Sequence, residues 1–201
     1  MEIETEINYG GLKKLVQAMS KQYSVKVGLL ADKGGSDEVS ENMDMAGLGA
    51  LMEYGADIKI TKKMAAFLNI KAKELGLPAK EGKGDGYVHI PARSWLQMPL
   101  QKREALKKKI IEHFGGEGKE SIEAYITESG DLKSLAIMLG VSAVEQIQEA
   151  FDTSGFGEWK ENSPFTIADK GSAMPLIGKG KDNEASGALR NRITYEVSDN
   201  G

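Results

Sequence analysis

The chain has 201 residues, of which 40% are hydrophobic and 28% charged, and its formal net charge is −4. The length predicts one large domain or one domain with an elaboration, and the acidic balance argues against a surface that binds nucleic acid all over. The sequence has no cysteine, which excludes disulfides, thiol nucleophiles and zinc–thiolate sites. The acidic N-terminal residues lack the apolar region of a secretory signal, and no apolar run reaches the ~18 residues of a membrane span. We therefore expect a protein that works in an aqueous compartment and has no membrane partner.

The first 43 residues predict a strand, a helix, a second strand and a loop. Residues 2–7 alternate between charged and apolar or small side chains, which indicates a short edge strand. Residues 8–22 place apolar side chains at helical spacing and predict an amphipathic helix. Residues 23–31 alternate as in a strand with one buried face. The glycine, serine and acidic residues of 32–43 predict a solvated, mobile loop.

The next segment predicts a hairpin whose connection contains a helix. Residues 44–57 indicate a short helix, with Gly55 suited to a left-handed C-terminal cap. The strand candidates "IKI" at 58–60 and "YVHI" at 87–90 are expected to pair with each other. Between them, Thr61 opens a second short helix, and residues 77–86 form a flexible loop.

The second half is predicted to be mainly helical. A helix is expected from Ser94 to about Phe114, with Pro99 in its first turns, followed by a short helix over 119–130. Residues 131–152 then predict a long helix with Asp131 as its N-cap. Its apolar face is expected to contain Leu132, Leu135, Leu139, Ala143, Ile147 and Phe151.

The C-terminal segment is rich in glycine, serine and proline and ends in an alternating run over 192–198. Ile193, Tyr195 and Val197 share one face of this run, which predicts a strand. Together the elements predict an α+β fold with a small antiparallel sheet, mainly 23–31 and 192–198, packed against several helices and carrying an inserted hairpin. We expect residues 1–201 to form a single domain with flexible loops near 32–43, 77–86 and 178–188.

Motifs for catalysis or metal binding are not recognisable. The glycine–lysine clusters do not form a phosphate-binding loop: in "HFGGEGKES" the first required glycine is His113, and Lys119 is followed by Glu120. His89 and His113 lack the spacing of a helical ligand pair, and the GxSxG nucleophile pattern does not occur. The sequence therefore predicts neither an enzyme nor a cofactor or metal site.

A basic run lies in the predicted helix that begins at Ser94. Two interpretations stay open: a solvated helix face with lysine stems over apolar surface, or an electrostatic surface toward an acidic partner or the DNA backbone. No aromatic residues interleave with the cations, as stacking on single strands would require. The residues of this basic face are Lys102, Arg103, Lys107, Lys108 and Lys109.

Three stretches of the chain, in this order, resemble the neck and tail-component proteins of tailed bacteriophages. They are "ALMEYGA" at 50–56, "VHIPARSWLQ" at 88–97, and "SPFTIADKGSAMPLIGKGK" with "LRNRITYEV" within 163–197. The family includes head–tail joining, tail-completion and Mu-like virion morphogenesis proteins. One departure is "PLIGKGKDNEASGAL", where many relatives have Pro-Leu-Ile/Val-Asp-Thr-Gly followed directly by Leu.

The resemblance implies assembly and structural roles, not chemistry. It places a helix end at "EYG", a corner from the hairpin into a long helix at "IPAR", and a closing strand at the C-terminus. Arg93 and Trp95 are expected to fix the exit angle at the corner, with Tyr54 as packing support and the 77–86 loop as a contact element. The residues that it singles out are Glu53, Tyr54, Gly55, Pro91, Arg93, Trp95, Pro175, Leu176 and Tyr195.

The function implied by the resemblance is that of a structural virion protein. The chain is expected to form a homo-oligomeric ring, a hexamer by resemblance, in the phage neck or tail, assembled in the host cytoplasm. Its partners would be other neck, connector and tail proteins, with DNA passing the lumen without specific binding. The alternatives are a DNA-binding or packaging-associated morphogenesis protein that uses the basic face, and a morphogenesis chaperone absent from the finished particle. Connector, tail terminator and tail completion protein are not distinguished by the sequence.

Overall fold

A computed structural model describes residues 22–78, 86–115, 119–129, 131–177 and 187–199. The predicted strand at 2–7 and nearly all of the predicted helix at 8–22 lie outside the described residues. The same holds for most of the predicted loops at 77–86 and 178–188.

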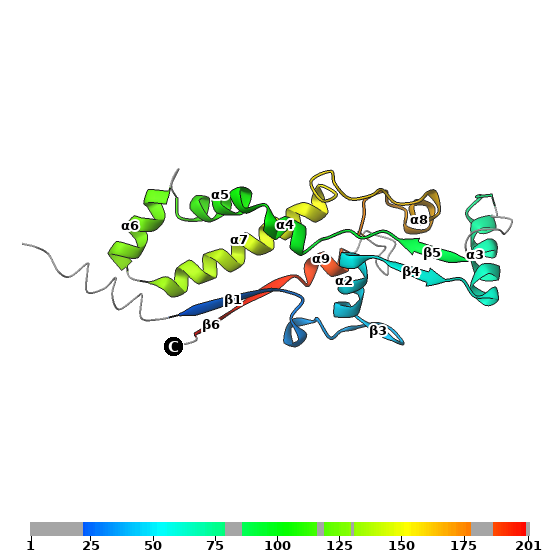
Figure 1. Cartoon of the computed structure of the whole chain (residues 1–201), viewed down its shortest axis with the longest axis horizontal. Coiled ribbons are helices and arrows are strands. Elements are labelled where there is room, and N and C mark those ends of the chain that lie inside the picture. Colours follow the sequence, from blue (N-terminus) through cyan, green and yellow to red (C-terminus); the bar gives the residue numbers. More distant parts are fainter. Residues whose placement is uncertain (1–21, 79–85, 116–118, 130, 178–186, 200–201) are drawn as a thin grey trace, which may run out of the picture. The chain divides into compact units, whose positions relative to one another are not determined.

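The described residues form an α+β fold, as predicted. They contain eight α-helices, one short 3-10 helix and six strands, and the strands pair in three two-stranded antiparallel sheets (Figure 1). The helices supply most of the ordered backbone, which agrees with the long periodic segments of the sequence. None of the helices within the described ranges is both long enough and apolar enough to cross a bilayer.

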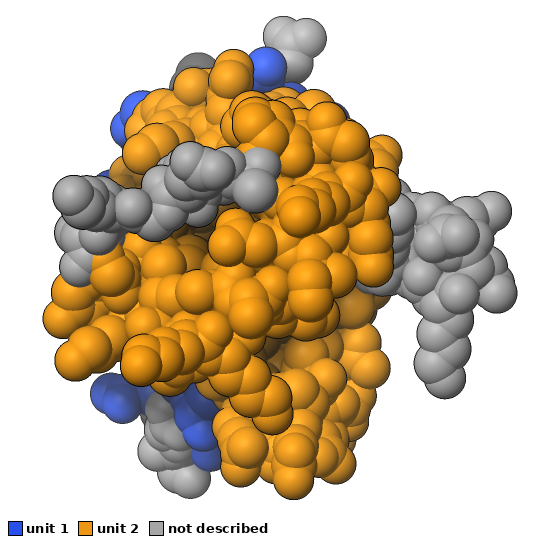
Figure 2. Space-filling model, turned by 90° about the vertical axis from the view of Figure 1, so that its right-hand side faces the viewer, with its two compact units in different colours: residues 1–28, 102–146, 194–201 blue, residues 29–101, 147–193 orange. Residues whose placement is uncertain are grey.

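The chain divides into two compact units, each assembled from separate segments (Figure 2). Unit 1 takes its described residues from 1–28, 102–146 and 194–201, and unit 2 consists of the described parts of 29–101 and 147–193. Neither unit is a continuous stretch, so each depends on contacts between residues far apart in the sequence.

Unit 1 is built around the strand pair predicted from the two alternating runs. Strand β1 (Tyr23–Gly28) pairs antiparallel with β6 (Thr194–Asp199), and Val25 lies opposite Val197. Tyr195 of β6 packs its ring against Gly140, where a Cβ atom would stand 2.3 Å from the ring. A larger residue at position 140 would therefore displace the tyrosine, which explains a glycine inside a helix.

The helix predicted to begin at Ser94 is divided, with α4 in unit 2 and α5 in unit 1. The continuous helix expected from Ser94 to Phe114 is wrong, because α4 (Gln97–Gln101) and α5 (Arg103–His113) are separated by Lys102. The Lys102 ψ angle of 66° is far from the helical value of about −42°. Pro99 does not cause the break: it lies in the first turn of α4, where a missing N–H costs no intrahelical bond.

Helix α6 (Lys119–Ser129) precedes the longest helix, α7 (Leu132–Asp152). Asp131 caps α7 as predicted, since its carboxylate accepts hydrogen bonds from the Ser134 backbone at 3.1 Å and from the Ser134 hydroxyl. Leu139, expected on the buried face, is 37% exposed. In the N-terminal half of α7 two small residues one position further along, Ala136 and Gly140, are buried instead, whereas Ala143, Ile147 and Phe151 are buried as predicted.

Unit 2 contains the predicted hairpin with a helix in its connection. After α2 (Met45–Tyr54), strand β4 (Ala56–Lys59) pairs antiparallel with β5 (Tyr87–Ile90), so that Ile58 lies opposite Val88. Between them is α3 (Lys62–Glu74), whose N-cap Thr61 accepts a hydrogen bond from the Met64 N–H at 3.2 Å. Figure 1 shows α3 at the far end of this two-stranded ribbon. Helices α8 (Pro164–Lys170) and α9 (Ala188–Asn191) complete the unit.

The segment 32–43 is more ordered in its backbone than the predicted loop. It includes most of the 3-10 helix η1 (Ala31–Lys33), strand β2 (Glu38–Ser40) and the start of strand β3 (Met43–Asp44), and β2 pairs with β3. The Asp44 side chain then caps α2 by accepting from the Gly47 N–H at 2.7 Å. The composition correctly indicated a solvated segment, but backbone bonds to neighbouring residues, such as Gly35 N–H to the Leu30 carbonyl at 2.8 Å, give it regular structure.

The Asp131 cap predicts a pH dependence of stability. Replacing Asp131 by alanine is expected to lower the free energy of unfolding by about 1 kcal/mol near neutral pH.

Hydrogen bonds from the Ser134 side chain and backbone lower the pKa of Asp131. A group with a lowered folded pKa stabilises fully above its unfolded pKa and loses that contribution as the pH falls through the folded value. The difference between wild type and Asp131→Ala, measured by urea unfolding, should therefore be constant above about pH 4 and shrink below it. A difference that persists unchanged in acid would contradict the assigned cap.

Candidate functional site

Glu53, near the end of α2, is buried and accepts three hydrogen bonds from the chain that enters α4. Its side chain is only 7% exposed. One carboxylate oxygen accepts from the Ser94 hydroxyl at 2.6 Å and the Gln97 N–H at 3.1 Å, and the other from the Leu96 N–H at 2.9 Å. The first N–H groups of a helix have no intrahelical acceptor, and a negative charge near them is favourable. Glu53 therefore joins the end of α2 to the start of α4.

Arg93 forms the second connection, between the exit from β5 and the segment 160–162. Its side chain is 6% exposed. Its guanidinium donates from Nε to the Lys160 carbonyl at 2.9 Å, and from Nη2 to the Glu161 carbonyl at 3.2 Å and Asn162 Oδ1 at 3.0 Å. Its own N–H donates to the Met52 carbonyl at 2.8 Å. The rigid fork of arginine matches several acceptors at once, which the single ammonium of lysine does not.

The positive charge of Arg93 is stabilised by the backbone carbonyl and side-chain amide oxygens that accept its hydrogen bonds. No carboxylate within the described residues forms an ion pair with it. Burial lowers the pKa of the Arg93 guanidinium, which stays protonated. The pKa of Lys170 is also lowered, first by its own burial and then by the charge of Arg93. The corner thus carries positive charge in partly desolvated surroundings.

Aromatic side chains fill the space beside these polar contacts. Trp95 is buried and donates its indole N–H to the Gly49 carbonyl at 2.8 Å, and Trp159 donates to the Ser94 carbonyl at 3.2 Å. The Phe151 ring contacts both tryptophans, with centroid distances of 6.2 Å to Trp95 and 5.5 Å to Trp159. Each tryptophan therefore has a satisfied N–H and an apolar contact, as buried indoles require.

Gly55 allows the two strands of the ribbon to leave the corner together. The predicted left-handed cap is wrong, because its φ of 70° is combined with a ψ of 175°. A Cβ atom at this position would stand 2.6 Å from the Ala92 nitrogen and 2.6 Å from the Ile90 oxygen. The glycine is therefore required by the close approach of the backbone after β5 as well as by its own conformation.

The structure brings together most, but not all, of the residues singled out from the sequence. Glu53, Gly55, Pro91, Arg93 and Trp95 all belong to the segments that meet here, and we call this cluster, with Asn162 and Trp159, the corner. The expected packing role of Tyr54 is wrong, since this side chain is 76% exposed. It follows Glu53 directly, and a helix turns neighbouring side chains about 100° apart, so burial of one leaves the other in water.

The remaining predicted positions lie at other places in the fold. Pro175 is buried and Leu176 has a φ of 62°, in the segment after α8, and Tyr195 belongs to the strand pair of unit 1. Asn162 connects the corner to this segment, because its amide donates to the carbonyls of Ala173 and Met174. Asn162 and Trp159 were missed from the sequence, where a tryptophan in a glycine-rich stretch is the only signal.

The basic face is only partly a free surface. Arg103, Lys107 and Lys108 are exposed on α5, whereas Lys102 and Lys109 are half-buried. Lys108 lies 3.8 Å from Glu112 on the next turn, a pair that contributes little to stability. Both interpretations of this face, solvated helix or electrostatic contact, are compatible with this exposure.

Both histidines contact a carboxylate on a neighbouring element. His89 Nδ1 lies 2.5 Å from Asp57 Oδ1 across the β4–β5 ribbon, and His113 Nε2 lies 2.9 Å from Glu145 Oε2. Among the residues that the structure describes, no three metal-ligating side chains gather as a metal ion requires. The polar atoms of the corner are engaged in internal hydrogen bonds, so this arrangement fixes backbone segments and does not present reactive groups.

Comparison with known proteins does not add a relative, since no family model, curated protein or solved structure matches this chain. The functional argument therefore rests on the residues themselves and their geometry.

Two glycines with similar φ angles separate steric contact from conformational strain. Gly55→Ala is expected to lower the free energy of unfolding by more than about 3 kcal/mol, because the new methyl group meets backbone atoms of 90–92. Gly76→Ala is the control: its φ is 67° and no atom lies within 4 Å of the added Cβ, so only the strain of about 1–2 kcal/mol remains. Urea unfolding of both variants measures the difference. Equal losses would show that the backbone after β5 does not press on Gly55.

Arg93→Lys tests the second connection of the corner. Lysine keeps the charge but cannot reach three acceptors in the arginine geometry, so we expect a loss of about 2–3 kcal/mol in the free energy of unfolding. The matched control Arg103→Lys, on exposed α5, should change it by less than about 0.5 kcal/mol. Similar values for both variants in thermal or urea unfolding would contradict the assigned role of Arg93.

Proposed function

We propose that this chain is a structural virion protein of a tailed bacteriophage, which forms a ring in the neck or at the head-proximal end of the tail. The observation that carries the proposal is the corner. Two of the three stretches that resemble the phage family, 50–56 and 88–97, are in direct contact through Glu53 and Arg93. Buried side chains engaged in internal hydrogen bonds fit a protein whose work is assembly.

The position of the ribbon supports the same proposal. Gly55 immediately precedes β4 and Pro91 immediately follows β5, so the corner holds both ends of the ribbon that carries α3. A ring of identical subunits needs two different surfaces on each subunit, one of which docks on the other surface of its neighbour. A projecting element held at its base is suited to such a contact, because less freedom is lost on docking.

In this proposal the mechanism is assembly without chemistry. The core of each unit provides the scaffold, and exposed elements contact neighbouring subunits and the other neck, connector and tail proteins. By the family resemblance the ring is a hexamer, and DNA passes its lumen without sequence-specific contacts. The net charge of −4 suits a surface along which DNA moves without binding strongly.

The direct test uses the phage that encodes this chain. Mass spectrometry of purified particles should detect the protein, and deletion of its gene should give DNA-filled heads and tails that do not join, as seen by electron microscopy. Complementation with the wild-type gene is the control. Particles that lack the protein and remain joined and infectious would overturn the neck role. Detection in assembly intermediates but not in finished particles would favour the morphogenesis chaperone.

The second candidate is a DNA-binding or packaging-associated protein, favoured by the exposure of Arg103, Lys107 and Lys108 on α5. Under the neck proposal, we expect filter binding to show no DNA affinity that falls steeply between low and high salt. Lys107→Glu/Lys108→Glu should then leave retention unchanged. Strong binding at low salt that this variant abolishes would instead support the second candidate, because phosphate contacts release counterions and weaken with salt.

A further inference from the structure

We propose that the outer face of α3 docks on the acidic hairpin of a second copy of this chain, in a head-to-tail contact. The α3 face consists of Lys63, Phe67, Ile70 and Lys73, and the acidic hairpin consists of residues 37–44. The inference rests on the proposed ring and names the two surfaces that would build it, but isolated protein is enough to test it.

The α3 face exposes apolar side chains that a monomer in water would bury. Residues 63, 67, 70 and 73 follow helical spacing and share one side of α3, whereas Leu68 and Ala72 face inward and are partly or fully buried. Phe67 is 62% exposed and Ile70 is 60% exposed. Ile58 and Tyr87, on the adjoining ribbon, are exposed as well. Neighbouring exposed apolar residues of this size on one projecting element indicate a protein contact surface.

The charge around these apolar residues is positive. Helix α3 has four lysines and one glutamate, which gives +4 − 1 = +3. Lys71 pairs with Glu74 at 3.5 Å and with Asp169 at 3.8 Å. Lys62, Lys63 and Lys73 are exposed and form no ion pair with another described residue. The partner surface for this face should therefore be acidic with an apolar centre.

The acidic hairpin has this composition. Residues 37–44 contain four acids and no lysine or arginine, a charge of −4, and Val39 is exposed between Glu38 and Glu41. Asp37 and Asp44 have structural roles, in an ion pair with Arg192 and as the cap of α2. Glu38 and Glu41 are exposed and have no ion pair within the described part of the chain. Their carboxylates are thus available to lysines of another copy.

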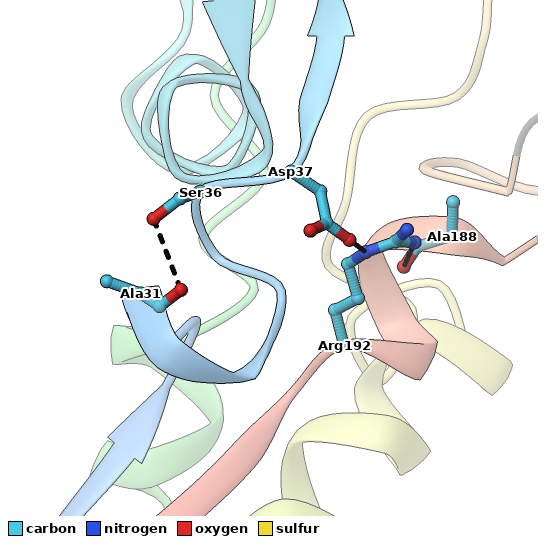
Figure 3. Close-up of polar contacts among 5 residues, drawn as sticks. All are labelled: Ala31, Ser36, Asp37, Ala188 and Arg192. Atoms are coloured by element: carbon cyan, nitrogen blue, oxygen red, sulfur yellow. Dashed lines mark hydrogen bonds and ion pairs between the residues drawn. The ribbon is translucent and has the colours of Figure 1, made fainter.

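The base of the hairpin is fixed by several bonds, some of which Figure 3 shows. Arg192 Nε donates to Asp37 Oδ2 at 2.8 Å, and the Ser36 hydroxyl donates to the Ala31 carbonyl at 3.2 Å. The Met45 N–H also donates to the Asp37 carbonyl at 2.8 Å. A surface that is already ordered loses less entropy on binding, so these contacts favour docking.

The geometry favours a second copy as the occupant. The hairpin contacts α2, whereas α3 lies at the far end of the β4–β5 ribbon, so the two surfaces of one copy lie apart (Figure 1). Their charges of +3 and −4 are complementary, and they are different patches on one unit. Contact between unlike patches is heterologous, and repetition of it closes a ring or extends a filament.

A charge-reversal pair tests this contact. One variant reverses the lysines of the α3 face, Lys63→Glu/Lys73→Glu, and the other reverses the hairpin, Glu38→Lys/Glu41→Lys. In sedimentation velocity at low salt we expect wild type to self-associate and each variant alone to associate at least tenfold more weakly, about 1.4 kcal/mol, because like charges then meet. A 1:1 mixture of the two variants should recover self-association. The acidic α3 of one variant then meets the basic hairpin of the other, and the unaltered basic α3 meets the unaltered acidic hairpin.

The apolar part of the contact has its own variants and controls. Phe67→Gln/Ile70→Gln should weaken self-association about tenfold or more, while Met174→Gln, an exposed apolar residue outside both surfaces, should not. Lys107→Glu/Glu104→Lys on α5 is the matched charge control. All substituted positions are exposed, and circular dichroism and thermal unfolding check that each variant folds.

Three results would overturn the contact. The first is wild-type protein that stays monomeric up to about 1 mM, since a dissociation constant above this value is too weak for a specific interface. The second is variants that associate as strongly as wild type, and the third is a 1:1 mixture that does not recover self-association. None of these three results contradicts the proposed neck function if finished particles contain the protein. Recovery in the mixture together with absence from finished particles would remove the neck role alone.

Discussion

Unit 2 depends on two buried charges of opposite sign that do not pair with each other. Glu53 is satisfied by the hydroxyl and N–H groups at the start of α4, and Arg93 by the carbonyl and amide oxygens of 160–162. Removing either charge from water costs several kcal/mol unless hydrogen bonds replace the lost hydration. Both sets of partners must therefore be in place together, which fixes the end of α2, the exit from β5 and the segment 160–162 in one arrangement.

This constraint connects the core to the surface. Glu53 and Arg93 lie two residues from Gly55 and Pro91, respectively, where the β4–β5 ribbon begins and ends. Because the corner sets the base of the ribbon, it also sets the position of α3 relative to the acidic hairpin within unit 2. The proposed head-to-tail contact needs such a fixed spacing, since subunits whose two surfaces vary in relative position would not close into a regular ring.

Local patterns in the sequence predicted the features that depend on local physics. Alternation identified β1 and β6, and side-chain chemistry identified the caps Thr61 and Asp131. The β4–β5 pairing was expected as well, although β4 begins at Ala56 rather than Ile58. Features set by distant neighbours were missed or wrong. The conformation of Gly55 follows from the backbone of 90–92, and the Ser94 partner of Glu53 lies 41 residues along the chain. No local signal marks Asn162 as a partner of Arg93. The exposure of Tyr54 and Leu139 likewise depends on which side of a helix the fold covers.

The central claim is that the corner is the stable base of unit 2, and amide hydrogen exchange of the wild-type protein tests it most directly. The account predicts that the N–H groups of Arg93, Leu96 and Gln97, which donate to the Met52 carbonyl and the Glu53 carboxylate, exchange among the slowest in residues 29–101, in the cooperative unit with the highest opening free energy. Exchange of these amides as fast as those of the exposed acidic hairpin would contradict it.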